Sequence, residues 1–218
     1  MQKIRIDPNK PDEKIIKLAA KILQNGDLLV CPTETVYILA ADATNPKAIE
    51  KVFEVKGRSW TKALHVVVKD FEMAKKYVKY DDAALGLANA FLPGSLTLVL
   101  EKISNSLPDA LTGSRPTLGI RIPPLNLNTA LARELGEPYT ATSANKSGGQ
   151  NPYTVDDVSN QLTTKDKAAI KLILDAGELA HQEPSTVVDC TKVPPKILRA
   201  GPVSEEDIRN VLGFDVYG

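Results

Sequence analysis

The chain has 218 residues, of which 43% are hydrophobic and 25% charged, and its formal net charge at pH 7 is zero. This composition is typical of a globular protein with a hydrophobic core, and contacts with nucleic acid or phosphate must come from a local patch of charge. The length of residues 1–218 fits one domain, or one domain with a small extension.

The few cysteines and histidines narrow the possible chemistry. Both cysteines lie in strand-like surroundings far apart in sequence, and the first residues have no apolar signal-peptide core, so we expect a reduced, cytoplasmic chain. No apolar run reaches the length of a membrane span. The candidate zinc ligands are Cys31, His65, His181 and Cys190. Their spacing matches no zinc motif, and we expect no metal that is permanently bound by protein ligands.

Strand and helix patterns alternate along the chain. In order, they predict a strand at residues 4–6, a helix at 12–23, a strand at 28–31, a helix at 46–56, a strand at 64–68, helices at 71–77 and 81–91, strands at 96–100 and 119–123, a helix at 129–135, a strand entering a loop at 139–149, a helix at 155–162, strands at 172–175, 185–190 and 196–199, and a helix at 204–212. Several neighbouring strands are too close for a helical crossover. We predict an α/β fold with a twisted, mixed parallel and antiparallel open sheet and helices packed on it.

The stretch after the first buried strand is the most distinctive part of the pattern. Residues 32–37 become polar but keep strand character, so Thr33, Thr35 and Tyr37 should form one row of hydroxyls. The next helix ends at residues 56–58, two cations on a glycine turn. Together they suggest a site for a small anionic ligand. An edge strand beside a solvated turn would give the same pattern.

Two later segments are also unusual in their polarity. Arg121 alternates with Ile120 and Ile122 in a strand otherwise suited to burial, and an unpaired buried charge is costly. Its partner is either a structural carboxylate or the carboxylate of a ligand. Residues 143–149 combine hydroxyls with glycines and would let backbone N–H groups approach an anion, although an ordinary turn-rich loop looks the same.

The familiar catalytic motifs are absent. The chain has neither of the common glycine-rich phosphate loops and no nucleophile elbow, and His65 within a valine run is expected to be a sheet residue. What remains is a set of cations and hydroxyls at strand ends: Thr35, Lys56, Arg58, Arg121, Ser143, Asn145, Ser185 and Arg199. Such a set suits phosphoryl or nucleotidyl transfer, which needs positioning and charge neutralisation.

Seven short motifs occur in a specific order. They are PTETVY at 32–37, KGR at 56–58, PG at 93–94 with Thr97, GIRIP at 119–123, SAN at 143–145 with SG at 147–148, STVVD at 185–189 and RAG at 199–201. In this order they resemble the YrdC-like family of L-threonylcarbamoyladenylate synthases, over about residues 10–212. The resemblance implies a YrdC-like fold with a deep, basic concave cleft, in the short, single-domain form.

The activity implied by this resemblance joins L-threonine, bicarbonate and ATP into threonylcarbamoyl-AMP and releases pyrophosphate. The product serves N6-threonylcarbamoyladenosine modification of tRNA through a downstream transfer enzyme, Mg²⁺ accompanies ATP, and no membrane is involved. Family members are also described as binding double-stranded RNA or tRNA, so the alternative is a non-catalytic RNA-binding module. A carbamoyl-adenylate step in hydrogenase maturation is disfavoured, because the chain lacks acylphosphatase and zinc-finger segments.

Site residues are implied by the same resemblance, position by position. Thr35, Arg121 and Ser185 would hold threonine, with Arg121 on its carboxylate. The residues implied for the nucleotide are Lys56, Arg58, Thr117, Ala141, Ser143, Asn145 and Arg199. Of these, Lys56 and Arg58 would be catalytic because they neutralise developing charge.

The chain departs from the family pattern at a few positions. Ile38 stands where the family usually has glycine. Ser59, Ala63 and Ser95 stand where proline is common in the family. These changes affect the expected loop geometry and rate rather than the expected reaction.

Overall fold

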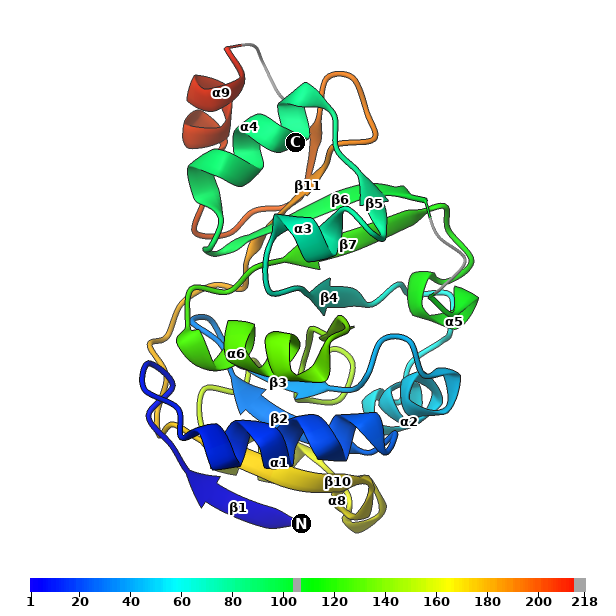
Figure 1. Ribbon diagram of the computed structural model, residues 1–218, viewed down its shortest axis with the longest axis vertical. Helices are drawn as coiled ribbons and strands as arrows, with labels where there is room; N and C mark the ends of the chain where they lie inside the picture. The colour runs from blue at the N-terminus through cyan, green and yellow to red at the C-terminus, as the bar shows by residue number, and fades with distance from the viewer. Residues whose placement is uncertain (104–106, 214–218) are drawn as a thin grey trace.

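The structure, a computed structural model, describes residues 1–103 and 107–213 (Figure 1). Residues 104–106 and 214–218, which the single-domain prediction includes, lie outside the described residues. The strands are β1 (Gln2–Arg5), β2 (Leu28–Pro32), β3 (Tyr37–Ala40), β4 (His65–Val67), β5 (Val78–Lys79), β6 (Leu96–Lys102), β7 (Thr117–Arg121), β8 (Tyr139–Thr140), β9 (Thr142–Ser143), β10 (Ile170–Asp175), β11 (Thr186–Asp189) and β12 (Lys196–Arg199). The helices are α1 (Glu13–Gln24), α2 (Pro46–Lys56), α3 (Phe71–Ala74), α4 (Asp82–Phe91), α5 (Asp109–Thr112), α6 (Asn126–Leu135), α7 (Val155–Gln161), α8 (Thr164–Ala169) and α9 (Glu205–Leu212). Each of these helices is too short or too polar to span a bilayer.

The described strands form two mixed sheets. The first, in the lower half of Figure 1, has the order β1-β10-β2-β3-β9, with β3 antiparallel to both of its neighbours. The second has the order β12-β11-β6-β7-β4-β8, in which parallel and antiparallel pairs alternate, and β5 pairs with the far end of β6. The predicted class, a mixed open sheet with packed helices, is confirmed, but the strands are divided between two sheets.

Strand β2 is buried on both faces, which explains its unbroken apolar run. Leu28 and Val30 pack into a core with α2 and the second sheet, whereas Leu29 and Cys31 pack into another core with α1 and α6. Figure 1 shows these two helices side by side against the first sheet. The first sheet is thus the layer between two hydrophobic cores.

Residues 33–36 form a tight turn between β2 and β3, so the prediction of continuous strand through residues 32–37 is wrong. The Thr33 hydroxyl donates to the Val36 carbonyl at 2.8 Å and accepts from the amides of Thr35 and Val36. These bonds replace ladder bonds and close the turn, which is how threonine competes with sheet pairing. The hydroxyls of Thr33 and Thr35 still meet, at 3.1 Å.

Tyr37 does not belong to the predicted row of hydroxyls. Its hydroxyl donates to the Gly177 carbonyl at 2.7 Å and accepts from the Ala176 amide at 2.9 Å. Tyr37 therefore ties the start of β3 to the loop after β10 and does not line the cavity described below.

Strands β8 and β9 follow each other directly but belong to different sheets. β8 pairs with β4 and β9 pairs with β3, and Ala141 is the single residue between them. The Ala141 amide donates to the His65 carbonyl at 2.7 Å, and the Thr140 amide donates to the Ala41 carbonyl at 2.8 Å. The chain therefore crosses from one sheet to the other at Ala141.

Most other differences from the predicted pattern concern short elements. The helix predicted at residues 71–77 ends at Ala74, and α5, α8 and β5 were not predicted. None of these three has more than six residues, which is too few to establish a periodic pattern. The longer helices and buried strands occur where they were predicted, with ends shifted by a few residues.

We predict that Thr33→Ala lowers the free energy of unfolding by about 1–3 kcal/mol, because buried amides of the turn lose their acceptor. Urea denaturation measures the change. Thr164→Ala, at an exposed position of α8, is the control and should alter stability by less than about 0.5 kcal/mol. Equal stability of Thr33→Ala and the wild type would contradict this role of the hydroxyl.

Candidate functional site

A cavity of about 270 Å³ is lined by residues from both sheets. Its walls come from the β2–β3 turn, β3 and β9 on one side, from β4, β7 and β12 on the other, and from the end of α2. The residues that it brings together include nine of the ten predicted for the site: Thr35, Lys56, Arg58, Arg121, Ala141, Ser143, Asn145, Ser185 and Arg199. Four of these are cations, and no lining residue in the described part of the chain is acidic. The cavity therefore favours an anionic ligand.

Thr117 is the predicted site residue that the structure places elsewhere. It begins β7 and lines a separate hollow beside Tyr80 and Cys190, whereas Arg121 ends the same strand at the cavity. A strand rises about 3.3 Å per residue, so four residues separate the two positions by roughly 13 Å. Thr117 therefore does not line this cavity, and its assignment to the nucleotide stays a prediction.

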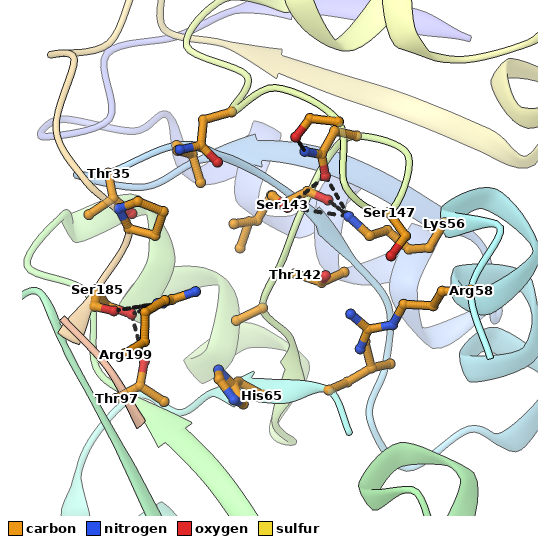
Figure 2. A pocket seen from close by; sticks show the side chains of 18 of the residues that line it. Thr35, Lys56, Arg58, His65, Thr97, Thr142, Ser143, Ser147, Ser185 and Arg199 are labelled. Atoms are coloured by element: carbon orange, nitrogen blue, oxygen red, sulfur yellow. Dashed lines mark hydrogen bonds between the residues drawn. The ribbon is translucent and has the colours of Figure 1, made fainter. Parts of the chain in front are cut away.

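Lys56 ends α2 and is almost fully buried, with its ammonium group directed toward Ser143 (Figure 2). Gly57 follows in the left-handed conformation, at φ 59°, which ends the helix and turns the chain toward Arg58. Lys56 Nζ donates to Asn145 Oδ1 and to the Ser143 carbonyl, both at 2.6 Å. The Ser143 hydroxyl donates to the same Asn145 oxygen at 2.7 Å. One amide oxygen thus fixes both a cation and a hydroxyl.

The loop after β9 is held by the same side chains. Asn145 Nδ2 donates to the carbonyls of Gly149 and Gln150, at 3.0 and 2.9 Å. The Ser147 amide donates to the Lys56 carbonyl at 2.9 Å. Asn145 therefore supports the glycine-containing loop.

Burial lowers the pKa of both cations at this end of the cavity, and neighbouring positive charges lower that of Lys56 further. Burial, with the charges of Arg58 and Lys146, lowers the pKa of Lys56 to about 7. Burial also lowers the pKa of Arg58, whose Nη2 donates to the Ala63 carbonyl at 2.7 Å. A polyvalent anion bound here would relieve the repulsion between these cations.

The opposite end of the cavity carries Thr35, Ser185 and Arg199 (Figure 2). Arg199 Nη2 donates to the carbonyl of Ser185 at 2.6 Å and to its hydroxyl at 3.1 Å. The Ser185 hydroxyl also lies 2.8 Å from that of Thr97, a lining residue to which the sequence assigned no role. The proline–glycine motif just before Thr97 was the available clue.

Arg121 forms an ion pair with Glu34 of the β2–β3 turn, and both side chains are largely buried. The sequence pattern left two kinds of partner open for Arg121, and the resemblance favoured a ligand carboxylate. The structure supplies a structural carboxylate. A guanidinium has five N–H donors, so pairing with Glu34 leaves others for a second anion.

His65 lines the cavity from β4, although the sequence suggested only an ordinary sheet residue. Burial and the charges of three nearby arginines lower its pKa to about 4, so the imidazole is neutral at pH 7. The ring lies against Gly119, where a Cβ would come within 2.4 Å of His65 Cδ2. A neutral ring so confined offers a hydrogen bond to a ligand without adding charge.

Among the described residues, no group of three or more His, Cys, Asp or Glu side chains could hold a metal ion. A Mg²⁺ that accompanies ATP stays a prediction. Nucleotide phosphates would supply oxygen ligands of the kind that Mg²⁺ prefers.

A family model for Sua5, YciO and YrdC proteins, described as telomere recombination, matches residues 21–201. The chain belongs to the Sua5/YciO/YrdC family. The family that the seven motifs indicated is thereby confirmed.

Individual family members cover the chain to different extents. The threonylcarbamoyl-AMP synthase of Pyrococcus abyssi is 36% identical over 93% of this chain and 58% of its own length. A Methanocaldococcus jannaschii protein is 34% identical over 81% of this chain and 80% of its own length. The chain thus spans little more than half of the first relative and most of the second.

Solved structures of the family agree in fold. Pyrococcus abyssi Sua5 complexed with L-threonine matches with a TM-score of 0.89 and 34% identity, over 99% of this chain and 62% of that protein. Escherichia coli YciO matches with a TM-score of 0.84 and 25% identity, over 95% of this chain and 98% of that protein. The family fold therefore extends over nearly the whole chain.

We predict that the affinity for inorganic tripolyphosphate falls as the pH rises from 7 to 9. A bound polyanion stabilises the charged form of Lys56, so binding above the group's pKa of about 7 takes up a proton. Isothermal titration calorimetry in buffers of different ionisation enthalpy measures this uptake. Lys56→Arg, which stays charged, should show a shallower pH dependence. Identical slopes for the two proteins would contradict the prediction.

Proposed function

We propose that the chain is an L-threonylcarbamoyladenylate synthase, which forms threonylcarbamoyl-AMP and pyrophosphate from L-threonine, bicarbonate and ATP. One observation carries the proposal: a single cavity has cations suited to a polyanion at one end, and guanidinium and hydroxyl groups suited to an amino acid at the other. The relative named threonylcarbamoyl-AMP synthase and the Sua5 structure with L-threonine support it.

The triphosphate of ATP would lie at the Lys56 end. Lys56 and Arg58 provide the charge, and Ser143, fixed by Asn145, provides a hydroxyl. Ala141, at the crossover between the sheets, lines the cavity beside them. Mg²⁺ bound to the phosphate oxygens would supply further neutralisation.

Threonine would lie at the opposite end. Arg121 would bind its carboxylate through the donors that Glu34 leaves free, with Thr35 and Ser185 supplying hydroxyls. Arg199, assigned to the nucleotide by position, lies beside Ser185 (Figure 2). We therefore place Arg199 where the two substrates meet.

The reaction needs no protein nucleophile. The threonine amine captures carbon dioxide, supplied by bicarbonate, and gives N-carboxy-threonine. An oxygen of this carbamate attacks the α-phosphorus of ATP, the bond to the bridging oxygen breaks, and pyrophosphate leaves with its electron pair. The chain orients both substrates and neutralises the developing charge, which is the larger part of catalysis in transfers of this kind.

The product would be passed to a downstream enzyme that modifies adenosine in tRNA. We propose a cytoplasmic location for this reason, because tRNA and ATP are both available there. Direct contact of this chain with tRNA or double-stranded RNA is part of the same proposal.

We predict that pyrophosphate release requires L-threonine, bicarbonate and ATP together. Arg121→Ala should lower threonine-dependent release by about 10²- to 10³-fold, because it removes the carboxylate-binding charge. A coupled pyrophosphatase assay measures the rate, and Arg133→Ala, at an exposed position of α6, is the control.

Release that is independent of L-threonine would contradict the proposed function. RNA binding that falls steeply with salt and is indifferent to threonine, together with no turnover, would instead favour the RNA-binding module. In that case Arg121→Ala should weaken RNA binding no more than the removal of any other single cation does.

Arg58→Ala should lower kcat by about 10²- to 10³-fold and leave the KM for threonine nearly unchanged, because this cation lies at the phosphate end. Lys62→Ala, in the same loop but outside the cavity lining, should keep the wild-type rate. Steady-state kinetics with each substrate varied in turn measures both parameters. A rise confined to the KM for threonine would indicate that Arg58 acts at the threonine end of the cavity, and would contradict the prediction.

A further inference from the structure

Glu34 lies behind Arg121 rather than in the cavity. Its side chain is 12% exposed and is not among the cavity-lining residues, whereas Arg121 is. Glu34 Oε1 accepts from Arg121 Nη2 and from the Ser95 hydroxyl, the latter at 3.0 Å. Glu34 therefore joins the β2–β3 turn to the end of β7 and to the segment just before β6.

The Arg121 guanidinium is held from one side only. Arg121 Nε and Glu34 Oε2 are buried and have no hydrogen-bond partner among the described residues. Arg121 Nη1 also makes no hydrogen bond in the described part of the chain, but it is not one of the atoms shut off from solvent. Since Arg121 lines the cavity, Nη1 is the nitrogen that remains open to a ligand.

The turn that carries Glu34 does not depend on its carboxylate. Thr33 closes the turn through its bonds to Thr35 and Val36. The carboxylate of Glu34 instead makes its contacts with residues outside the turn, Arg121 and Ser95. Its contacts are therefore directed at the cavity wall rather than at local folding.

We propose that Glu34 is a positioning residue, which fixes the Arg121 guanidinium so that its open edge meets the carboxylate of an amino-acid substrate. This inference rests on the proposed function, because the carboxylate concerned is that of L-threonine. Glu34 itself does not touch the substrate. Ser95 is the second support, because its hydroxyl donates to the same Glu34 oxygen that accepts from Arg121.

Glu34→Ala should weaken L-threonine binding by about 10- to 100-fold, by analogy with the loss of residues that orient metal ligands. ATP binding should stay unchanged. Glu34→Gln keeps an acceptor in the same place and should retain most of the affinity for L-threonine. The affinity of Ser95→Ala should lie between those of Glu34→Ala and Glu34→Gln. Isothermal titration calorimetry with each ligand measures these affinities, with Glu206→Ala on the exposed face of α9 as the control.

L-threoninol, which lacks the carboxylate, separates positioning from general damage. If Glu34 acts through Arg121, its loss should reduce the preference for L-threonine over L-threoninol. A folding defect would weaken the binding of both compounds and of ATP, and would lower the Tm.

The inference would be overturned if Glu34→Ala bound L-threonine as tightly as the wild type or more tightly. Tighter binding would mean that Glu34 competes with the threonine carboxylate for Arg121. If Glu34→Ala does not fold, Ser95→Ala decides, and wild-type threonine affinity in that variant would overturn the inference. Wild-type protein that binds ATP but not L-threonine would instead overturn the proposed function. The two failures are therefore distinguishable.

Discussion

The cavity depends on the hydrogen bonds of one buried ammonium group, that of Lys56. Lys56 Nζ connects the end of α2 to β9 through the Ser143 carbonyl and to the following loop through Asn145. Taking an ammonium ion out of water costs several kcal/mol, and neutral oxygens rather than a carboxylate offset that cost here. Because its partners carry no charge, Lys56 retains a positive field that phosphate groups can use.

The cations of the cavity have two kinds of partner, a carboxylate or neutral hydrogen-bond acceptors. Arg121 is neutralised by Glu34, so its guanidinium can bind a second, singly charged group without a large excess of positive charge. Lys56 and Arg58 have neutral hydrogen-bond acceptors, and the pKa of Lys56 is lowered by its burial and by the charge of Arg58. The first arrangement suits a carboxylate and the second suits a polyphosphate. Pairing with a carboxylate thus distinguishes Arg121 from Lys56 and Arg58.

Sequence reasoning located the cavity well but not its internal supports. The resemblance predicted nine lining residues. They lie at or near the ends of strands and helices, and these ends converge between the two sheets. Thr117 lies outside this cavity because it shares a strand with Arg121 but begins at the opposite end. The Glu34–Arg121 pair joins positions 87 residues apart and depends on a turn that the threonine hydroxyls create. No local pattern in the sequence reports such a contact, and the division into two sheets at Ala141 is similarly non-local.

The contact between His65 and Gly119 constrains how the family can vary. A methyl group at position 119 would collide with the imidazole, so a bulkier residue there requires a smaller one at position 65. These two positions should covary across natural sequences. Members in which the pair has been exchanged would have an aliphatic side chain in place of a polar ring at this point of the cavity wall.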